Sequence, residues 1–217
     1  MATNPFDEAA ARWDDNAHRV RLMGAIGEAI LREAAPAPQC SVLDYGCGTG
    51  LVGLYLLPHV RDVTGADSSQ GMLDVLAGKI AQGRLATMRT LRLNLEHEPP
   101  PAARQWDLIT VGMAMHHIAD VDKVLAAFRA MLRPGGRLCV ADLDTEPGTF
   151  HGGPMAQSVP HHGFDRREMK DRLTRLGFTD PRDVTVVRFP KPVDGGGEQV
   201  FSIFLITATA GTPARES

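Results

Sequence analysis

Residues 42–50 read VLDYGCGTG: an apolar run ends at an acidic residue, and glycine then occupies every second position. Glycine has no Cβ atom, so Gly46, Gly48 and Gly50 allow the backbone to turn sharply and to approach a ligand closely. A helical pattern follows, and the N-terminus of a helix favours negative charge, such as the carboxylate of a bound amino-acid moiety. The stretch therefore predicts a strand, a ligand-binding loop and a helix.

Strand-like and helix-like segments alternate along the chain around this loop. The predicted strands are 41–45, 62–66, 87–93, 106–112 and 137–143, and the helices between them are 52–57, 69–82 and 121–132. Short, continuously apolar strands are typical of a parallel sheet that is buried on both faces. The alternation predicts an α/β fold with right-handed crossovers and helices on both faces.

The C-terminal third departs from this alternation. Residues 165–176 have a helical pattern, with Asp165 placed as the N-cap and Gly177 as the stop signal. Residues 183–189 and 199–208 flank the turn PKPVDGGGE and predict an antiparallel hairpin. The sheet should therefore have seven strands and be mostly parallel, with an antiparallel C-terminal strand.

A length of 217 residues fits a single domain, residues 1–217, with four parts. Residues 1–36 contain two helices with no strand to pack between, which predicts an N-terminal helical lid. Residues 37–143 form the ligand-binding core. Residues 144–163 are rich in Gly, Pro and His and are long for a connection, which favours an active-site loop. Residues 164–210 hold the C-terminal helix and hairpin.

Composition and charge exclude several classes of protein. The hydrophobic fraction is 43%, as in ordinary globular proteins, and the net charge of −3 gives no general attraction to nucleic acid or anionic lipid. No run approaches the roughly 20 apolar residues of a membrane span, and the acidic N-terminus does not resemble a secretory signal. Three cysteines without CxxC spacing support no disulfide framework. We therefore expect a soluble, cytoplasmic protein.

Asp67 ends the second predicted strand, where a carboxylate can accept hydrogen bonds from both hydroxyls of a ribose. The same residue could instead cap the helix that follows. The ribose role suits two cofactors equally, because Gly48, Gly50 and Gly53 also satisfy the dinucleotide pattern G-x-G-x-x-G. Taken alone, these residues leave both a nicotinamide dinucleotide and S-adenosylmethionine open.

Further motifs favour S-adenosylmethionine. Asn94 and Leu95 follow the third strand, residues 106–118 read WDLITVGMAMHHI, and residues 127–144 read AFRAMLRPGGRLCVADLD. With the glycine loop, they resemble the class I S-adenosylmethionine-dependent methyltransferases from about residue 6 to residue 208. The opening FDEAAARWDD resembles the small-molecule branch, including quinone C-methyltransferases and the type 11 and type 12 domains. Those proteins usually carry Tyr where this chain has Trp13.

The resemblance implies a Rossmann-like, doubly wound sheet of order 3-2-1-4-5-7-6. It also implies that S-adenosyl-L-methionine is the cofactor and S-adenosyl-L-homocysteine the product. For Trp13 a contact with the sulfonium competes with plain core packing, and for Arg19 a pair with the methionine carboxylate competes with a solvated helix face. The expected cofactor-binding residues are Trp13, Arg19, Asp44, Gly46, Gly48, Gly50, Asp67, Ser68, Met72, Asn94, Leu95 and Gly112.

Methyl transfer is an in-line displacement, so the enzyme mainly has to align the acceptor, and a general base is needed only if the acceptor loses a proton. His116 and His117 follow the fourth strand, and His162 lies in the long loop. We predict these three as the catalytic candidates, with His117 or His162 as the base, because imidazole titrates near working pH. Helix capping or packing is the alternative for the His pair.

Carboxylates and imidazoles are also dense between Asp142 and His162, and these ligand types suit zinc, iron or manganese. No spacing in that stretch matches a recognised site, so we assign no metal ion from sequence.

The predicted protein is thus an enzyme that moves a methyl group to O, N, S or C of a small-molecule acceptor. An NAD(P)-dependent oxidoreductase and a non-catalytic S-adenosylmethionine-binding module are the alternatives. We expect no nucleic-acid partner, and assembly as a homodimer is left open.

Overall fold

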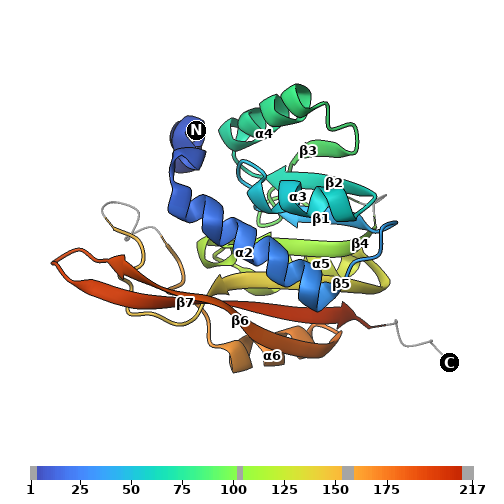
Figure 1. Ribbon diagram of the computed structural model, residues 1–217. Coiled ribbons are helices and arrows are strands. Elements are labelled where there is room, and N and C mark those ends of the chain that lie inside the picture. The colour runs from blue at the N-terminus through green and yellow to red at the C-terminus, as the bar shows by residue number, and fades with distance from the viewer. Residues whose placement is uncertain (1–3, 102–104, 153–158, 212–217) are drawn as a thin grey trace.

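Seven strands form one mixed sheet of order β3-β2-β1-β4-β5-β7-β6 in the computed structural model, which describes residues 4–101, 105–152 and 159–211 (Figure 1). The predicted strand order is confirmed. The strands are β1 (Ser41–Tyr45), β2 (Asp62–Asp67), β3 (Met88–Arg92), β4 (Trp106–Gly112), β5 (Leu132–Leu143), β6 (Phe178–Pro192) and β7 (Glu198–Ala210). The helices are α1 (Pro5–Ala9), η1 (Ala10–Asp15), α2 (Ala17–Ala34), α3 (Leu51–Leu56), η2 (Leu57–His59), α4 (Gln70–Gly83), η3 (Met115–His117), α5 (Val121–Met131) and α6 (Arg166–Arg175).

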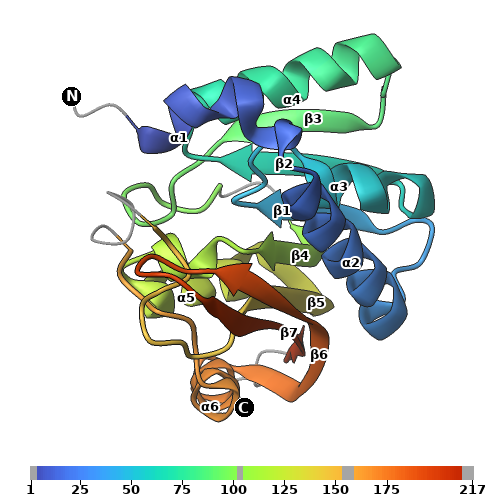
Figure 2. The ribbon, with the colours of Figure 1, turned by 60° about the vertical axis from the view of Figure 1, so that its left-hand side comes forward.

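Helices cover both faces of the sheet, as expected for a doubly wound fold (Figure 2). Neighbouring residues of β1 point to opposite faces, so Val42 packs in the cluster beneath α2 and α3, whereas Leu43 packs in the cluster beneath α5 and α6. β1 pairs in parallel with β2 on one side and with β4 on the other. The carboxyl ends of these three strands therefore meet at one edge of the sheet.

Polar side chains cap the helices that follow the strands. The Ser69 hydroxyl accepts a hydrogen bond from the Met72 amide at the start of α4, and the Asp120 carboxylate accepts one from Lys123 at the start of α5. Asp165 caps α6, and Gly177 follows it with a φ of +84°, so both predicted signals are confirmed.

The structure extends two predicted strands. We predicted that the fifth strand begins at residue 137, but β5 begins at Leu132 and includes the RPGG stretch. Leu132 pairs with Trp106 and Arg137 with Leu108, so residues 133–136 bulge from the ladder. β6 likewise begins at Phe178 rather than at 183, because pairing with β7 continues across its irregularities. The strand propensity of the residues did not reveal either extension.

The N-terminal segment lies beside the helices that follow β1 and β2. α1 and η1 contact α4, and α2 packs along α3 (Figure 2). The division of the chain into lid, core and loop stays a prediction. Residues 153–158 of the predicted active-site loop lie outside the described residues.

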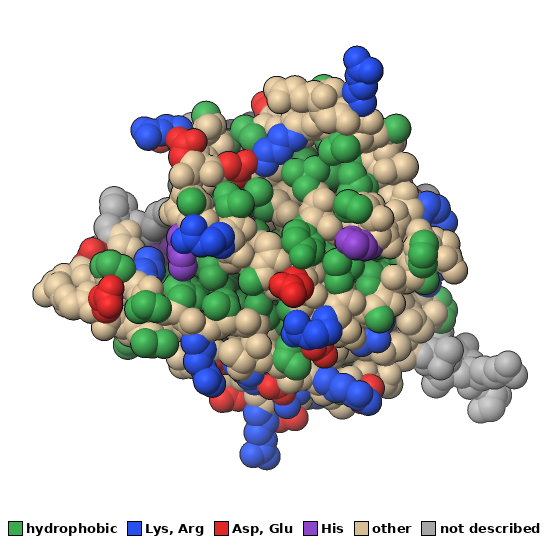
Figure 3. All heavy atoms as spheres, viewed as in Figure 1, with side chains coloured by type: hydrophobic (Ala, Val, Ile, Leu, Met, Phe, Trp, Pro, Cys, Tyr) green, Lys and Arg blue, Asp and Glu red, His purple; other side chains and the backbone are tan. Residues whose placement is uncertain are grey.

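Charged side chains of both signs are interspersed on the face drawn in Figure 3, in keeping with the net charge of −3. Among the described helices, none combines the length and the apolar content needed to cross a lipid bilayer.

We predict that Phe204→Ala lowers the free energy of unfolding by about 3–5 kcal/mol, since the ring is fully buried within β7 and its loss leaves a cavity. Val200→Ala, in the same strand, should change it by less than about 0.5 kcal/mol because Val200 is 66% exposed. Urea denaturation of both variants measures the difference. Equal losses would contradict the assigned burial of Phe204.

Candidate active site

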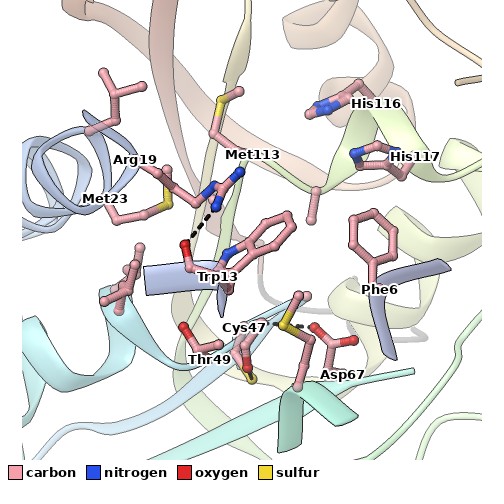
Figure 4. Close-up of a pocket in the computed structure, with 18 of the residues that line it drawn as sticks. Phe6, Trp13, Arg19, Met23, Cys47, Thr49, Asp67, Met113, His116 and His117 are labelled. Carbon is pink, nitrogen blue, oxygen red and sulfur yellow. Dashed lines mark hydrogen bonds between the residues drawn. The ribbon is translucent and has the colours of Figure 1, made fainter. Parts of the chain in front are cut away.

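A cavity of about 400 Å³ opens at the carboxyl ends of β1, β2 and β4. The strand order reverses between β1 and β4, and ligands of open α/β sheets bind beside such a reversal. Twelve of the fifteen predicted site residues line the cavity: Trp13, Arg19, Asp44, Gly46, Gly48, Asp67, Ser68, Met72, Asn94, Gly112, His116 and His117. Figure 4 shows several of them around the Trp13 ring.

The glycine loop has a left-handed backbone at all three predicted glycines, with φ of +66° at Gly46, +53° at Gly48 and +85° at Gly50. The three positions differ in what surrounds them. A Cβ atom would lie 2.5 Å from the Ala114 side chain at Gly46 and 2.4 Å from Leu76 at Gly50. At Gly48 the nearest atoms would be 3.8 Å away or farther. Gly48 therefore presents open backbone to the cavity, whereas Gly46 and Gly50 are required by packing.

The Asp67 carboxylate connects the glycine loop to the end of β2. One carboxylate oxygen accepts a hydrogen bond of 2.8 Å from the Gly48 amide, and the other accepts one of 2.8 Å from the Ser69 amide. Burial raises the pKa of Asp67, and these two backbone donors oppose the rise. The Ser68 amide also acts on this carboxylate. A carboxylate has about four acceptor sites, so Asp67 can still accept a hydrogen bond from a ligand in the cavity.

Asp44 lies beneath the loop and is only 1% exposed. Its oxygens accept hydrogen bonds from the Gly53 amide of α3, at 2.9 Å, and from the Thr110 hydroxyl of β4, at 3.1 Å. Burial raises the pKa of Asp44 to about 7, and both hydrogen bonds act against the rise. The side chain thus fixes the loop relative to the sheet.

The N-terminal segment covers the loop. The Arg19 guanidinium stacks 3.7 Å above the centre of the Trp13 ring, and it also donates a hydrogen bond of 2.6 Å to the Trp13 carbonyl oxygen. The Phe6 ring meets the Trp13 ring edge to face at 5.8 Å and the His117 ring at 5.1 Å. In Figure 4 the indole lies between Asp67 and Met113. Trp13 therefore lines the cavity rather than the core alone.

Two carboxylates fasten this segment to the cofactor-side edge. Asp7 accepts hydrogen bonds from the Ser69 hydroxyl, at 2.5 Å, and from the Gly71 amide, at 2.9 Å. Asp14 accepts a 2.7 Å hydrogen bond from the Thr49 hydroxyl, and it pairs with Lys79 at 2.6 Å. These contacts join α1 and η1 to the glycine loop and α4.

Three histidines lie close together on the side of Trp13 that faces away from Asp67 and the glycine loop (Figure 4). The His116 ring is 1% exposed, and its Nδ1 lies 2.7 Å from an Asp142 carboxylate oxygen. Its Nε2 lies 3.1 Å from Nε2 of His151. The His117 ring lies 4.2 Å from the His116 ring and 5.1 Å from the His151 ring, centre to centre. His116 and His117 occupy η3, directly after β4, and His151 comes from the loop after β5.

The proposed basis for His117 as a base is wrong. We expected its imidazole to titrate near working pH, but burial together with His116 and His151 lowers the pKa of His117 to about 3. Burial, His116 and Lys191 lower the pKa of His151 to about 4. Both rings are therefore neutral at pH 7 and are weak proton acceptors.

Three predicted residues do not line the cavity. Gly50 packs against Leu76, as described above. Leu95 is 1% exposed, and its amide donates to the Tyr45 hydroxyl oxygen. The His162 ring is half exposed, and its Nδ1 lies 3.8 Å from Glu146. Their ligand roles stay predictions, while the structure gives each another set of contacts.

Sequence reasoning missed several residues on the histidine side of the cavity. Phe150, Phe189, Lys191 and His18 line it. His151 lies in the stretch 142–162 that the sequence singled out, but its contact with His116, 35 positions away, was not foreseen. These residues come from α2, the loop after β5 and the C-terminal hairpin. They meet through the pairing of β5 with β7 and of β7 with β6 and through the packing of α2 on this hairpin, so a local motif could not reveal them.

Comparison with known proteins agrees with this geometry. Residues 43–138 match the family model described as a methyltransferase domain. This central part of the chain is therefore similar to a methyltransferase domain. The matched region begins in β1 and ends in β5, so it includes the glycine loop, Asp67 and the histidine pair. The resemblance inferred from the motifs is confirmed.

Two relatives and one solved structure show how far the likeness extends. An uncharacterized methyltransferase of Schizosaccharomyces pombe is 35% identical over 134 residues, which cover 57% of this chain and 47% of that protein. The ubiquinone biosynthesis O-methyltransferase of Acinetobacter baylyi is 25% identical over 149 residues, covering 67% and 63%. The chain thus spans less than two thirds of the length of these relatives. A SAM-dependent methyltransferase from Aquifex aeolicus superposes with a TM-score of 0.68 at 21% identity, covering 94% and 98%.

We predict that the buried Asp44 carboxyl makes the stability of this protein depend on pH. Its pKa rises on folding to about 7, so folding favours the protonated form. This contribution is fully present below about pH 4 and is lost as the pH rises through 7. The free energy of unfolding of the wild type, minus that of Asp44→Asn, should fall by more than about 1 kcal/mol between pH 5 and pH 8. Urea denaturation at both values measures it, and a pH-independent difference would contradict the assignment.

Proposed function

We propose that this protein transfers the methyl group of S-adenosylmethionine to a small-molecule acceptor. The observation that carries the proposal is the arrangement of the Asp67 carboxylate and the open backbone at Gly48, which together form one wall of a cavity of about 400 Å³. A cavity of this size suits a cofactor and a small acceptor. The membership of residues 43–138 in a methyltransferase domain family supports the same activity.

The residues on the glycine-loop side fit the donor. Asp67 keeps free lone pairs for ribose hydroxyls, and Asn94 and Met72 border the space where an adenine would lie. The amino-acid end would lie near the start of α3, where Gly46 and Gly48 expose backbone to the cavity. The Trp13 ring offers an aromatic face to which a positively charged sulfonium can bind. The positively charged Arg19 guanidinium already stacks on this ring. When bound, the cofactor supplies an activated methyl group.

The residues on the histidine side fit an acceptor with aromatic or apolar surface. Phe150 and Phe189 line this end of the cavity. His18 also lines it, and its Nε2 is buried without a hydrogen-bond partner among the described residues. A buried polar atom of this kind is costly unless a ligand satisfies it. The acceptor would therefore combine a ring or apolar body with a polar group near His18.

The two alternative functions make different demands on the same residues. A nicotinamide oxidoreductase would use the G-x-G-x-x-G register, whose third glycine serves close packing of the helix on the sheet. A Cβ at Gly53 would meet Asp44, Met88 and Val63, so this glycine serves packing of α3 and does not favour one cofactor over the other. A non-catalytic binding module would bind the cofactor without turnover, and the acceptor-side groups would then lack a purpose.

The proposal includes the predicted lid, the predicted active-site loop and a cytoplasmic location. Residues 1–36 would act as a lid, because Asp7 and Asp14 fasten α1 and η1 over the cofactor side. Residues 144–163 would contribute to the acceptor side through Phe150 and His151. A cytoplasmic location is supported by Cys40, Cys47 and Cys139, which are all free thiols.

We predict that Asp67→Ala weakens the binding of S-adenosylhomocysteine by more than tenfold, about 1.4 kcal/mol, because the ribose hydrogen bonds and the anchor of Gly48 are lost together. Asp74→Ala is the matched control, since Asp74 lies exposed on α4 and pairs only with Gln70 among the interactions found. Isothermal titration calorimetry of both variants measures the change. An unchanged affinity of Asp67→Ala would remove Asp67 from the cofactor site.

Incubation of the protein with methyl-labelled S-adenosylmethionine and a metabolite extract tests the activity itself. We expect label to enter a small molecule that mass spectrometry can identify. Label found only in macromolecules would contradict a small-molecule acceptor. Binding of the cofactor without any labelled product would favour the non-catalytic module.

A further inference from the structure

Three imidazoles converge on the acceptor side of the cavity, and methyl transfer as proposed above does not require all of them. The nitrogen atoms that His116, His117 and His151 can offer all lie within 4.8 Å of one another. We propose that these three side chains bind a divalent cation of the zinc class. Zinc, iron, cobalt and nickel ions favour imidazole ligands, and three protein ligands with one open position are typical of catalytic zinc sites.

The distances suit such a cation. Tetrahedral coordination at zinc–nitrogen distances of about 2.0–2.1 Å places two ligand nitrogens about 3.3 Å apart. Nε2 of His116 and Nε2 of His151 are already 3.1 Å apart. The remaining separations, at most 4.8 Å, must close by about 1.5 Å for tetrahedral coordination. His117 and His151 are only partly buried, so rotation of these two side chains can achieve this without moving the sheet.

Asp142 provides the support that metal-binding histidines usually have. Its side chain is fully buried, and its carboxylate lies 2.7 Å from Nδ1 of His116. The carboxylate also accepts hydrogen bonds from the backbone amides of His116 and Leu143, so it is held in place. A carboxylate at Nδ1 keeps the proton there and directs the Nε2 lone pair toward His151 and the cavity.

The contact between His116 and His151 is compatible with a cation that replaces the proton shared between the two rings. Two neutral imidazoles can face each other through their Nε2 atoms only if one of them carries the proton there. A cation between them lets both lone pairs point inward. Charged groups of both signs lie near the three histidines. The Lys191 ammonium is positive and donates to the Phe150 carbonyl oxygen. The carboxylates of Glu146, which follows β5, and Asp142, which lies behind His116, are negative. The carboxylates offset the ammonium.

Such an ion would face the acceptor, because all three histidines line the same cavity as Trp13 and Gly48. This step rests on the proposed function. An acceptor hydroxyl or thiol bound at the open position would release its proton to water more readily. Its lone pair would then form the new bond to the methyl carbon, while the carbon–sulfur bond breaks and its electron pair stays on sulfur. His117 and His151 would thereby contribute as ligands rather than as bases.

Binding of Zn²⁺ to protein freed of metal by a chelator tests the site without any acceptor. Competition with a chromophoric chelator gives stoichiometry and affinity, and Co²⁺ in place of Zn²⁺ reports four-coordination through its visible absorption. We expect one ion per chain and the intense absorption of four-coordinate Co²⁺. His151→Ala and His117→Ala should each weaken binding at least tenfold. His59→Ala is the matched control and should bind like the wild type, because His59 is exposed in η2 and does not line the cavity.

Asp142→Asn tests whether metal binding needs the carboxylate that orients His116, or only the presence of the three histidines. An amide donates a proton to Nδ1 of His116 and moves the imidazole proton to Nε2, so affinity should fall about 10–100-fold although all three histidines remain. Circular dichroism and S-adenosylhomocysteine binding of the same samples show that each variant is folded. Absence of stoichiometric binding by the wild type, or wild-type affinity in both His151→Ala and His117→Ala, would overturn the metal site. Binding of S-adenosylhomocysteine to the wild type is measured separately. Failure of the proposed cofactor site can therefore be told apart from failure of the metal site.

Discussion

The buried carboxylate of Asp44 joins the three elements on which the cavity depends. It belongs to the fully buried strand β1, accepts a hydrogen bond from the Thr110 hydroxyl in β4 and accepts another from the Gly53 amide in α3. β1 and β4 are the strands between which the sheet order reverses. Because the reversal opens the cavity and the glycine loop lies between β1 and α3, one side chain fixes the position of the loop relative to both halves of the sheet. The burial that makes this possible also raises its pKa.

The core of the fold could be predicted because its signals are local. β1 and β4 have the predicted bounds, since each is a short apolar run between clear turn residues. The start of β5 could not be predicted, because residues 133–136 resemble a turn and belong to the strand only through the pairing of Leu132 with Trp106. The cofactor side was likewise readable from contiguous motifs. Gly50 is the instructive exception: its positive φ and the nearby Leu76 explain the glycine without a ligand.

The histidine side was less accessible to sequence reasoning, because its members meet only through strand pairing. Gly112 of β4 pairs with Ala141 of β5, and this register places Asp142 beside the residues that follow β4. His116 therefore meets Asp142, and the chain that continues from β5 returns His151 to the same place. A search for ligands at fixed spacing within residues 142–162 could not find this set, because two of its three histidines precede that stretch. The pKa of His117 depends on the same assembly, so it too was hidden.

The stacked pair of Trp13 and Arg19 divides the cavity into two chemical environments. On one side, backbone amides and the Asp67 carboxylate offer directional hydrogen bonds to a polar, partly charged molecule. On the other side, imidazoles and phenylalanine rings surround a largely buried space, where desolvation strengthens any charge interaction. Methyl transfer needs such a division, because the donor must be gripped through its polar ends while the acceptor atom must be dry and aligned. Trp13 belongs to the N-terminal segment that Asp7 and Asp14 fasten to α4 and the glycine loop. Movement of that segment would therefore change both environments at once, so in the proposed reaction entry of the two substrates and alignment of the reacting atoms would depend on the same few hydrogen bonds.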